Sequence, residues 1–567
     1  MTVAPPPPAT APLDHADPAL PRSALSLAPN PVLVEALAAS RDMRAIQRLA
    51  DAGPAHDERP GDDSAATSAA ADAAPSMHSR PSARRTGLGD PSADGAARGA
   101  FHRYHIATRP SPDLADLPSR FLVKVSRPGL AKLLITEAIQ YWGHWETVLS
   151  RPCVYGVFSG PVGGFAPRPN LCVGCLRCTI QHPSVVRIER NPAWDGWGDS
   201  FFTPKMVETV LTEAATGAVP VKGQGYRGRF GGQGWDAVWT DMSEIVRPTR
   251  DGIHGREMIS TAVDIGGKPM YLTFDAAGAV AGPAPRTTSL PLPALFDAPP
   301  DALLGDPRVV ALWTAAARAL GTLAVLPLRV VERDRLAGDA IAVRLVGRDD
   351  ASALAGLGFE PRLVEVDDAA LAPAVAEYAP RAVTALRLPA AAGWWTAVER
   401  GYDHGIRVFH LCCDYHGRGV DATGRQSFVR DILIDAHHAL VERGIRDEVT
   451  LIASGGIVMA EHLPKAIICG ADAVALDTPL VAALQARPLG EGTASDTARY
   501  VLPNGLDPAW GTQRLINLCG AWRDQLLEIM GAMGLREVRR LRGELGRAMF
   551  QPELEHEAFG GIDGFEG

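Results

Sequence analysis

The run from Val449 to Thr478 reads VTLIASGGIVMAEHLPKAIICGADAVALDT. Its two ends, residues 449–453 and 473–476, are short aliphatic segments, a pattern typical of strands buried on both faces. Residues 460–469 between them have the length and spacing of a helix, and Gly455 and Gly456 separate that helix from the first strand. The run therefore predicts a strand, a helix and a second strand, which is the repeating unit of a parallel α/β sheet.

The same alternation extends back to about residue 290. Further candidate strands are residues 292–296, 322–328, 340–345, 362–366, 382–388 and 407–412, and helices are expected at 306–320 and 428–443. Together with the two strands above, this makes eight strands within about 190 residues. That number favours a (β/α)8 TIM barrel over residues 290–505 rather than an open doubly wound sheet.

In such a barrel the working residues follow the C-terminal ends of the strands. The sixth strand is followed by DYHGR, which places the candidate catalytic residues Asp414, His416 and Arg418 within five positions. His416 is the best candidate for a proton donor, and Arg418 or Arg425 could hold a substrate carboxylate. A purely structural role for His416 is equally compatible with the sequence.

Glycine-rich or polar turns follow the last two strands. Ser454, Gly455 and Gly456 come after the seventh strand, and Asp477 and Thr478 come after the eighth. Many barrels bind a phosphate of a cofactor or substrate at these two places, on backbone N–H groups. The alternative is that the glycines only separate strands from helices.

A second motif, LCVGCLRCTIQHP at residues 171–183, precedes the barrel. It spaces Cys172, Cys175 and Cys178 by two residues and then offers His182, which is the bacterial ferredoxin pattern with histidine in place of the last cysteine. The motif predicts an iron–sulfur cluster of the 4Fe–4S or 3Fe–4S type. The fourth ligand is His182 or Cys153, or is missing in a three-iron cluster; a zinc site or a metal-free loop is the alternative.

The rest of the chain divides by composition. Residues 1–100, rich in Pro, Ala, Ser and Asp, are expected to be a disordered tail. Residues 101–220 are the expected ferredoxin-like unit, with a strand at 121–125 and helices at 130–149 and 204–216. The Gly/Arg-rich residues 221–289 either hold a carboxylate or phosphate or serve as a connector. Residues 506–567 are helical, with a helical pair at 511–547 that breaks around Gly534.

The composition narrows the function classes. The chain of 567 residues is 46% hydrophobic and 21% charged with a net charge of −9, which favours neither nucleic acid nor a membrane surface as a partner. The proline-rich, acidic start is unlike a signal peptide, and no apolar run reaches membrane-spanning length. Eight cysteines, three of them clustered, do not look like a disulfide framework. We expect a soluble, cytoplasmic protein, and a homo-oligomer is compatible with these values.

The run from Val449 to Leu484 and the preceding GIRVFHLCCDYHGRG (residues 405–419) resemble the phosphate-binding half of the FMN domain of glutamate synthase. Residues 239–257 and 515–534 resemble relatives that carry a ferredoxin-like segment before the barrel. This resemblance implies FMN on the barrel with an iron–sulfur cluster nearby. It also implies that Ser454, Gly455 and Gly456 form one phosphate turn, and that Gly470, Asp477 and Thr478 fall in a second.

The sequence departs from this family in three places. Residues 414–419 replace the family's glycine-rich loop after the sixth strand, and LPALFDAPPDALLG (residues 292–305) replaces its first-strand signature. Because no cysteine precedes Cys153, we do not expect the glutaminase domain of the full-length enzyme in this chain.

Together these features predict an oxidoreductase that depends on flavin and iron–sulfur and acts on a small amino or 2-oxo acid or a related imine. A ferredoxin or a reductase-type protein would supply its electrons. The alternative is a non-catalytic barrel subunit or a redox sensor that has lost FMN.

Overall fold

The computed structural model describes residues 104–144, 153–160, 163–219, 234–240, 259–268, 273–281, 286–347 and 349–562. All of these belong to one compact unit, Arg84–Gly567. The expected tail at 1–100 and most of the Gly/Arg-rich segment lie outside the described residues. In the part of the chain that is described, no helix is both long and apolar enough to span a membrane.

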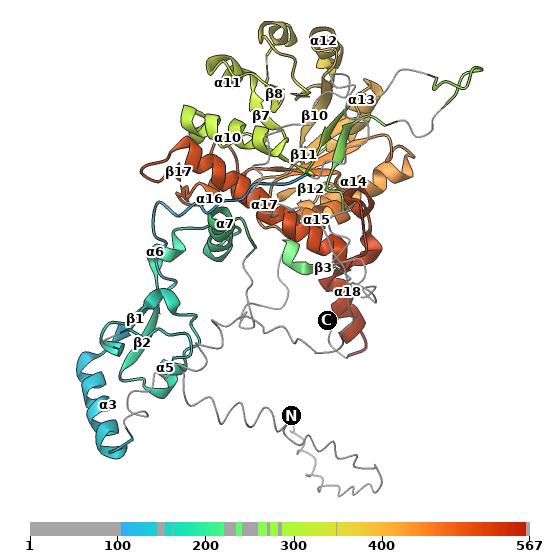
Figure 1. Ribbon diagram of the computed structural model, residues 1–567. Coiled ribbons are helices and arrows are strands. Elements are labelled where there is room, and N and C mark those ends of the chain that lie inside the picture. Colours follow the sequence, from blue (N-terminus) through green and yellow to red (C-terminus); the bar gives the residue numbers. More distant parts are fainter. Residues whose placement is uncertain are drawn as a thin grey trace, which may run out of the picture. The chain divides into compact units, whose positions relative to one another are not determined.

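Eight parallel strands close into a barrel, so the predicted TIM-barrel fold is confirmed (Figure 1). Every predicted strand is present to within a few residues. In order around the barrel they are β6 (Ala294–Phe296), β7 (Ala324–Pro327), β8 (Ile341–Leu345), β9 (Leu363–Val366), β10 (Val383–Pro389), β11 (Val408–Cys412), β14 (Thr450–Ser454) and β15 (Ala473–Leu476).

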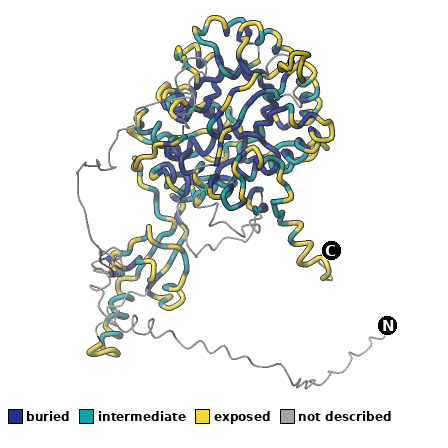
Figure 2. Tube along the Cα trace, turned by 45° about the vertical axis from the view of Figure 1, so that its right-hand side comes forward, coloured by how far each residue is buried: buried dark blue, intermediate teal, exposed yellow. Residues whose placement is uncertain are grey.

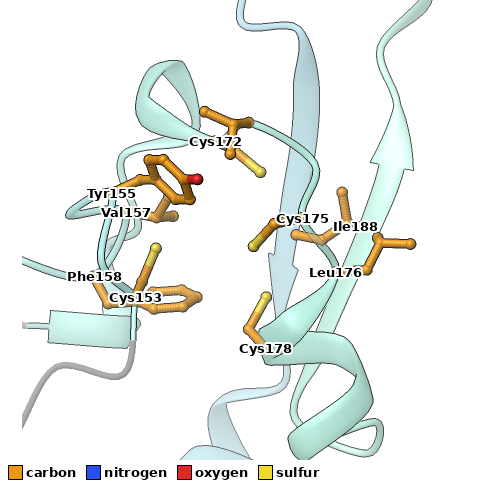
Figure 3. Close-up of a pocket in the computed structure, with 10 residues that line it drawn as sticks. Cys153, Tyr155, Val157, Phe158, Cys172, Cys175, Leu176, Cys178 and Ile188 are labelled. Atoms are coloured by element: carbon orange, nitrogen blue, oxygen red, sulfur yellow. The ribbon is translucent and has the colours of Figure 1, made fainter. Parts of the chain in front are cut away.

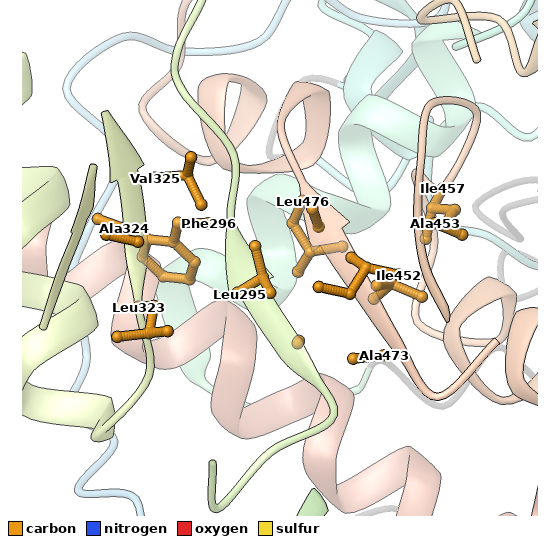
Figure 4. Packing of buried hydrophobic residues seen from close by; sticks show 14 of the residues in the cluster. Leu295, Phe296, Leu323, Ala324, Val325, Ile452, Ala453, Ile457, Ala473 and Leu476 are labelled. Atoms are coloured by element: carbon orange, nitrogen blue, oxygen red, sulfur yellow. The ribbon is translucent and has the colours of Figure 1, made fainter. Parts of the chain in front are cut away.

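Helices surround this barrel. The three predicted helices are observed as α10 (Pro307–Leu320), α14 (Val429–Glu442) and α15 (His462–Ile468). The others are α9 (Asp301–Leu304), α11 (Leu328–Arg333), α12 (Ala372–Tyr378), α13 (Trp394–Asp403) and α16 (Thr478–Ala483). Outward-facing strand residues pack against them: the Phe296 ring meets Trp313 of α10 edge-on, with ring centroids 5.9 Å apart. Figure 4 shows part of this packing around Phe296 and Leu476.

The inward-facing residues form two layers. Side chains alternate along a strand, and paired residues of neighbouring parallel strands face the same side. The strand register therefore places Leu295, Val325, Leu363, Val408 and Ile452 inside the barrel, where all five are buried. Towards the C-terminal ends of the strands this apolar filling gives way to charged side chains.

Short antiparallel pairs decorate the barrel. The pair of β4 (Val263–Gly266) and β5 (Thr287–Leu290) contacts its N-terminal end, where Gly266 exchanges hydrogen bonds with the Thr450 hydroxyl. A hairpin of β12 (Arg418–Val420) and β13 (Gln426–Phe428) follows β11. Two further pairs join β16 (Arg487–Pro488) to β17 (Tyr500–Val501) and β18 (Ala548–Phe550) to β3 (Val238–Thr240).

Two helices from outside the barrel repeat pack on each other. The helix predicted at 204–216 is α7 (Pro204–Thr216), which ends at Gly217 in the left-handed conformation. It contacts α16 and the long α17 (Pro508–Ala532). Arg514 of α17 is fully buried and binds the backbone carbonyl of Ser111 at 2.8 Å and the Asp113 carboxylate at 2.9 Å. The segment before the cysteine motif is thus tied to the barrel's helices.

The predicted helical pair at 511–547 is correct only for its first helix; the prediction of a second helix is wrong. Between α17 and the short α18 (Gln551–Phe559) the chain forms two 3-10 turns, Val538–Leu541 and Leu545–Arg547, and the strand β18. The reason is a close contact at Gly543, where φ is +71° and a Cβ would lie 2.3 Å from the His437 ring of α14. Docking on α14 overrides the helical spacing of the sequence.

The cysteine motif lies in a small module of its own. The predicted strand at 121–125 is β1 (Phe121–Val125), and it pairs antiparallel with β2 (Val186–Arg190). The helix expected at 130–149 is present only in its first part, as α3 (Arg127–Gln140), and residues 145–149 lie outside the described residues. The short α5 (Arg177–Gln181) overlaps the end of the cysteine motif. Its core is small, with Val157, Phe158, Val185 and Val186 buried, whereas most of the buried residues in Figure 2 belong to the barrel. Its likeness to a ferredoxin stays a prediction.

Candidate functional site

Four cysteines line one pocket of the module. Cys172, Cys175 and Cys178 come from the predicted motif, and Cys153 comes from the preceding turn. Figure 3 shows their sulfur atoms pointing into a common space, and the other lining residues are apolar or aromatic. Thiol donors converging in apolar surroundings are the ligand set of an iron–sulfur cluster or of a structural zinc ion.

The loop conformation explains this convergence. Gly174 and Leu176 both adopt left-handed backbone angles, with φ of +69° and +58°, and they turn the chain between successive cysteines. A Cβ at Gly174 would lie 2.5 Å from the Phe121 ring, so only glycine fits there. Further along, the His182 N–H donates to the Cys178 carbonyl oxygen at 2.9 Å and ends α5.

The electrostatics of the pocket favour a bound cation. Burial raises the pKa of the Cys172 and Cys178 thiols, and the neighbouring cysteines raise it further because their thiolates would repel one another. Four thiolates can therefore coexist here only beside positive charge, which a metal ion or cluster supplies.

The fourth ligand was left open between His182 and Cys153 by the sequence, and the pocket lining distinguishes the two residues. Among the described residues that line the pocket, Cys153 is present and His182 is not. The Cys153 carbonyl oxygen accepts from the Gly156 N–H at 3.0 Å in a tight turn, and Gly156 is itself left-handed. The structure therefore favours Cys153 over His182 as the partner of the three motif cysteines.

The predicted catalytic residues after β11 hold the loop together. One Asp414 carboxylate oxygen accepts the backbone N–H groups of His416 and Arg418, at 2.9 and 2.7 Å. His416 Nε2 lies 3.1 Å from an Asp199 carboxylate oxygen, and its ring stacks on Phe201 with centroids 5.6 Å apart. The structure thus brings Asp414 and His416 together in a loop-positioning role, while the Arg418 side chain is exposed.

The turn of Ser454, Gly455 and Gly456 packs tightly against this loop. Gly455 has φ of +88°, and a Cβ there would lie 2.3 Å from the Asp414 carbonyl oxygen. Gly456 has φ of +68°, and a Cβ there would lie 2.5 Å from the Gly417 Cα. Protein packing alone therefore requires both glycines, whether or not a phosphate binds beside them.

Asp477 and Thr478 lie at the end of β15, as predicted. An Asp477 carboxylate oxygen accepts the Thr478 N–H. Burial raises the Asp477 pKa to about 6, and the negative charge of Asp297 contributes to the rise. The Thr478 hydroxyl is buried and makes no well-formed hydrogen bond among the described residues, although its proximity to the Asp477 carboxylate lowers the pKa of that group.

Gly470 is at the wrong end of the barrel for the predicted phosphate turn. It precedes β15, whereas Asp477 and Thr478 follow that strand, so it lies at the N-terminal end. There its carbonyl oxygen accepts from Arg446 at 2.7 Å, and a Cβ would lie 2.5 Å from His437. Gly470 is a packing residue.

A group of inward-facing charged residues, which we call the charged layer, was not predicted. Its members come from six strands or strand ends: Asp297, Arg344, Glu365, Arg387, His410 and Asp477. Arg387 binds Asp297 through two hydrogen bonds of 2.7 and 3.0 Å and reaches Glu365 at 3.1 Å. The other Glu365 oxygen lies 2.7 Å from His410 Nδ1.

These contacts fix the charges of the layer. Burial alone would raise the Glu365 pKa, but the positive charges of His410 and Arg387 lower it to about 2. Burial alone would lower the His410 pKa, but the neighbouring Cys412 side chain and the Glu365 carboxylate raise it to about 10. At neutral pH the layer therefore contains an imidazolium beside a carboxylate, both with no exposed surface.

A weak signal in the sequence could have identified the charged layer. Glu365, Arg387 and His410 each interrupt an aliphatic strand, in LVEV, VTALRLP and VFHLC. A charged residue in a strand that is buried on both faces must have a buried partner. The sequence interpretation considered only the residues that follow the strands.

Comparisons with known proteins agree with the barrel's sequence motifs. A family model described as a conserved region in glutamate synthase matches residues 429–536. The archaeal-type glutamate synthase (NADPH) of Dehalococcoides mccartyi is 23% identical over 438 residues, which cover 66% of this chain and 86% of that relative. The archaeal glutamate synthase (NADPH) of Methanocaldococcus jannaschii is 40% identical over 116 residues, covering 19% of this chain and 22% of the relative.

Solved structures add nothing to this likeness. A mandelate oxidase variant with an FMN monooxide adduct is 14% identical, and the match covers 62% of this chain and 93% of that one. Its TM-score is 0.32. The sequence matches confirm the predicted relationship to glutamate synthases, which the family model places at residues 429–536.

Proposed function

We propose that this protein is a flavin- and iron–sulfur-dependent oxidoreductase of the glutamate synthase type, which reduces an imine derived from a small 2-oxo acid. The observation that carries the proposal is the convergence of Cys153, Cys172, Cys175 and Cys178 on one apolar pocket. A four-cysteine site in the same chain as an enzyme-type barrel gives electrons a place to enter the protein.

The cysteine pocket suits a 4Fe–4S cluster. Its donors are four thiols, and the spacing of three of them is that of bacterial ferredoxins. The raised pKa of Cys172 and Cys178 means that free thiols would stay protonated, so cluster binding would drive their ionisation. When bound, such a cluster accepts and releases single electrons.

The C-terminal end of the barrel has groups that suit a flavin phosphate. The Thr478 hydroxyl is a buried donor that makes no well-formed hydrogen bond among the described residues, and the turn at residues 454–456 lies at the end of the adjacent strand. Relatedness to glutamate synthases supports the same assignment. A bound flavin exchanges single electrons for a hydride, which is the chemistry that imine reduction needs.

One residue opposes the flavin phosphate. Asp477 is adjacent to Thr478, and a carboxylate there would repel a phosphate. Its pKa of about 6 means that the carboxyl can be neutral at mildly acidic pH. The flavin fits if binding is accompanied by protonation of Asp477.

The Asp477 carboxylate also favours a second function. If Asp477 excludes the phosphate, the protein is a barrel subunit or a redox sensor built around the cluster. The tight packing of Gly455 and Gly456 favours this candidate as well, because it explains those glycines without a phosphate.

The electron donor we propose is a ferredoxin or a reductase-type protein. The cluster would be its docking point, because Leu176, Ile180 and Val154 of the same module are exposed apolar residues. The substrate would be a small molecule.

Absorption spectroscopy on protein purified without oxygen tests the proposal. We expect flavin bands and a broad iron–sulfur shoulder, both bleached by dithionite, and glutamate formation from 2-oxoglutarate and ammonium with reduced methyl viologen as donor. A cluster shoulder without flavin, unchanged after incubation with FMN, would support the subunit or sensor instead. A colourless protein that contains zinc would refute both.

A further inference from the structure

The Glu365–His410 pair lies inside the barrel, in the charged layer. His410 Nδ1 is 2.7 Å from one Glu365 oxygen, and Arg387 binds the other at 3.1 Å. Neither Glu365 nor His410 has any exposed surface. A carboxylate that accepts a hydrogen bond from Nδ1–H orients an imidazole and leaves its second nitrogen, Nε2, for another partner.

That second nitrogen is the unusual feature. Within the described residues, His410 Nε2 is buried and has no hydrogen-bond partner. Buried polar groups in folded proteins are nearly always paired, and each exception requires an explanation. A ligand that enters the charged layer would give Nε2 the partner that the protein does not.

The charges around His410 come from every side. They are Glu365 of β9, Arg387 of β10, Asp297 beyond β6, and the thiol of Cys412 on the same strand. The residue paired with His410 on β14 is the apolar Ile452. Asp297 and Glu365 balance Arg387 and a protonated His410, so the imidazolium has a partner at neutral pH. After His410 loses its proton, Arg387 still bonds both carboxylates.

We propose that His410, positioned by Glu365, is the proton donor of the barrel and delivers its Nε2 proton to the nitrogen of a bound imine or the oxygen of a 2-oxo acid. The N–H bond of Nε2 breaks, and a bond forms from that proton to the substrate. The imidazole becomes neutral and keeps its Nδ1 proton, which stays hydrogen-bonded to the Glu365 carboxylate. The electron pair comes from the reduced cofactor of the proposed function, on which this inference rests.

The charged layer also indicates the substrate class. Arg344 and Arg387 both face this layer, and Arg344 Nε is a further buried donor without a partner in the described part of the chain. Arg387 is already bound to Asp297 and Glu365, so the Arg344 Nε donor is the group that suits the carboxylate of a small substrate. His416, the donor expected from the sequence, is instead already paired with Asp199.

The first test measures the ionisation of His410 directly. The protein is labelled with 15N-histidine, and the His410 signal is identified by its loss in the His410→Gln variant. We expect an imidazolium signal that persists from about pH 6 to about pH 9 and shifts when 2-oxoglutarate is added. A signal that titrates near the ordinary histidine pKa, or that 2-oxoglutarate leaves unchanged, would overturn the proposal.

The second test compares His410→Gln with His438→Gln, a matched change at an exposed histidine on α14. Glutamine keeps a donor for Glu365 but cannot act as an acid. We expect kcat for glutamate formation to fall about 100-fold or more in the first variant and to stay unchanged in the second. Glu365→Gln should shift the high-pH limb of the kcat profile downwards.

The outcomes separate this inference from the proposed function. Activity in the wild type with less than about a threefold loss in His410→Gln would refute the role of His410 and leave the function intact. A wild type without activity would refute the function, and the NMR titration would then decide on its own whether His410 is a charged, ligand-responsive site. Melting temperatures of both variants exclude misfolding as the cause.

Discussion

Gly455 and Asp414 come from different loops, yet a Cβ on Gly455 would lie 2.3 Å from the Asp414 carbonyl oxygen. The atom in the way belongs to the backbone and cannot rotate aside. The turn after β14 therefore rests directly on the loop after β11, and the two loops form one rigid rim at the C-terminal end of the barrel. The sequence resemblance assigned this glycine to phosphate binding, whereas the structure gives it a packing role as well.

Gly455→Ala should destabilise the protein even without flavin. A left-handed alanine costs about 1–2 kcal/mol, and the clash with Asp414 adds to that cost. Gly490→Ala is the matched control, because Gly490 has φ of +81° and open space around its Cβ position. Urea unfolding should show a loss about twice as large for Gly455→Ala; equal losses would mean that the rim contact is not rigid.

Flavin binding should depend on pH through Asp477. Its pKa of about 6 means that the carboxyl becomes neutral as the pH falls from about 7.5 to about 5.5, which removes its repulsion of a phosphate. FMN should therefore bind more tightly at the lower pH, as measured by quenching of flavin fluorescence. Asp477→Asn should bind FMN more tightly at pH 7.5 and show a weaker pH dependence.

Riboflavin, which has no phosphate, is the control for this experiment. It should show little pH dependence in either protein. A wild type and an Asp477→Asn variant with the same FMN affinity at every pH would mean that the phosphate lies elsewhere.

Acid should weaken the N-terminal end of the barrel through Asp472. Burial alone would raise its pKa, but Arg446, Arg542 and Lys268 lower it to about 2. Because the folded-state pKa lies below the unfolded one, Asp472 stabilises the fold above about pH 4, and that contribution is lost as the pH falls towards 2. Asp472→Asn should lose about 3–5 kcal/mol at pH 7, because it leaves the buried Arg446 without its carboxylate.

The measurement is the unfolding free energy of both proteins between about pH 3 and pH 7. The difference between wild type and variant should shrink as the pH falls. A constant difference would show that packing of the Asp472 side chain, and not its charge, is responsible.

The sequence predicted the barrel well, because buried strands need aliphatic runs and eight such runs are present. The sequence did not predict the contacts between residues that are far apart in the chain. Glu365, Arg387 and His410 are on three strands, and only the register of the closed sheet brings them together. The assignment of Gly470 to the phosphate turn was a different kind of error. Gly470 precedes β15, so the strand direction alone would have placed it at the N-terminal end of the barrel.

The cysteine site could be predicted because three of its ligands lie within seven residues. Like the aliphatic runs of the strands, this pattern is local in the sequence. The fourth ligand could not be chosen, because His182 and Cys153 are both near the motif in sequence. The fold favours Cys153, whose turn faces the loop formed by Gly174 and Leu176.

The iron and acid-labile sulfide content of three anaerobically purified proteins tests the central claim most directly. We predict about four iron and four sulfide per chain in the wild type and in His182→Ala, and a three-iron cluster or none in Cys153→Ala. Electron paramagnetic resonance of the reduced proteins would identify the cluster type. A wild type without iron, or a Cys153→Ala variant that keeps the full cluster while His182→Ala loses it, would contradict the four-cysteine site.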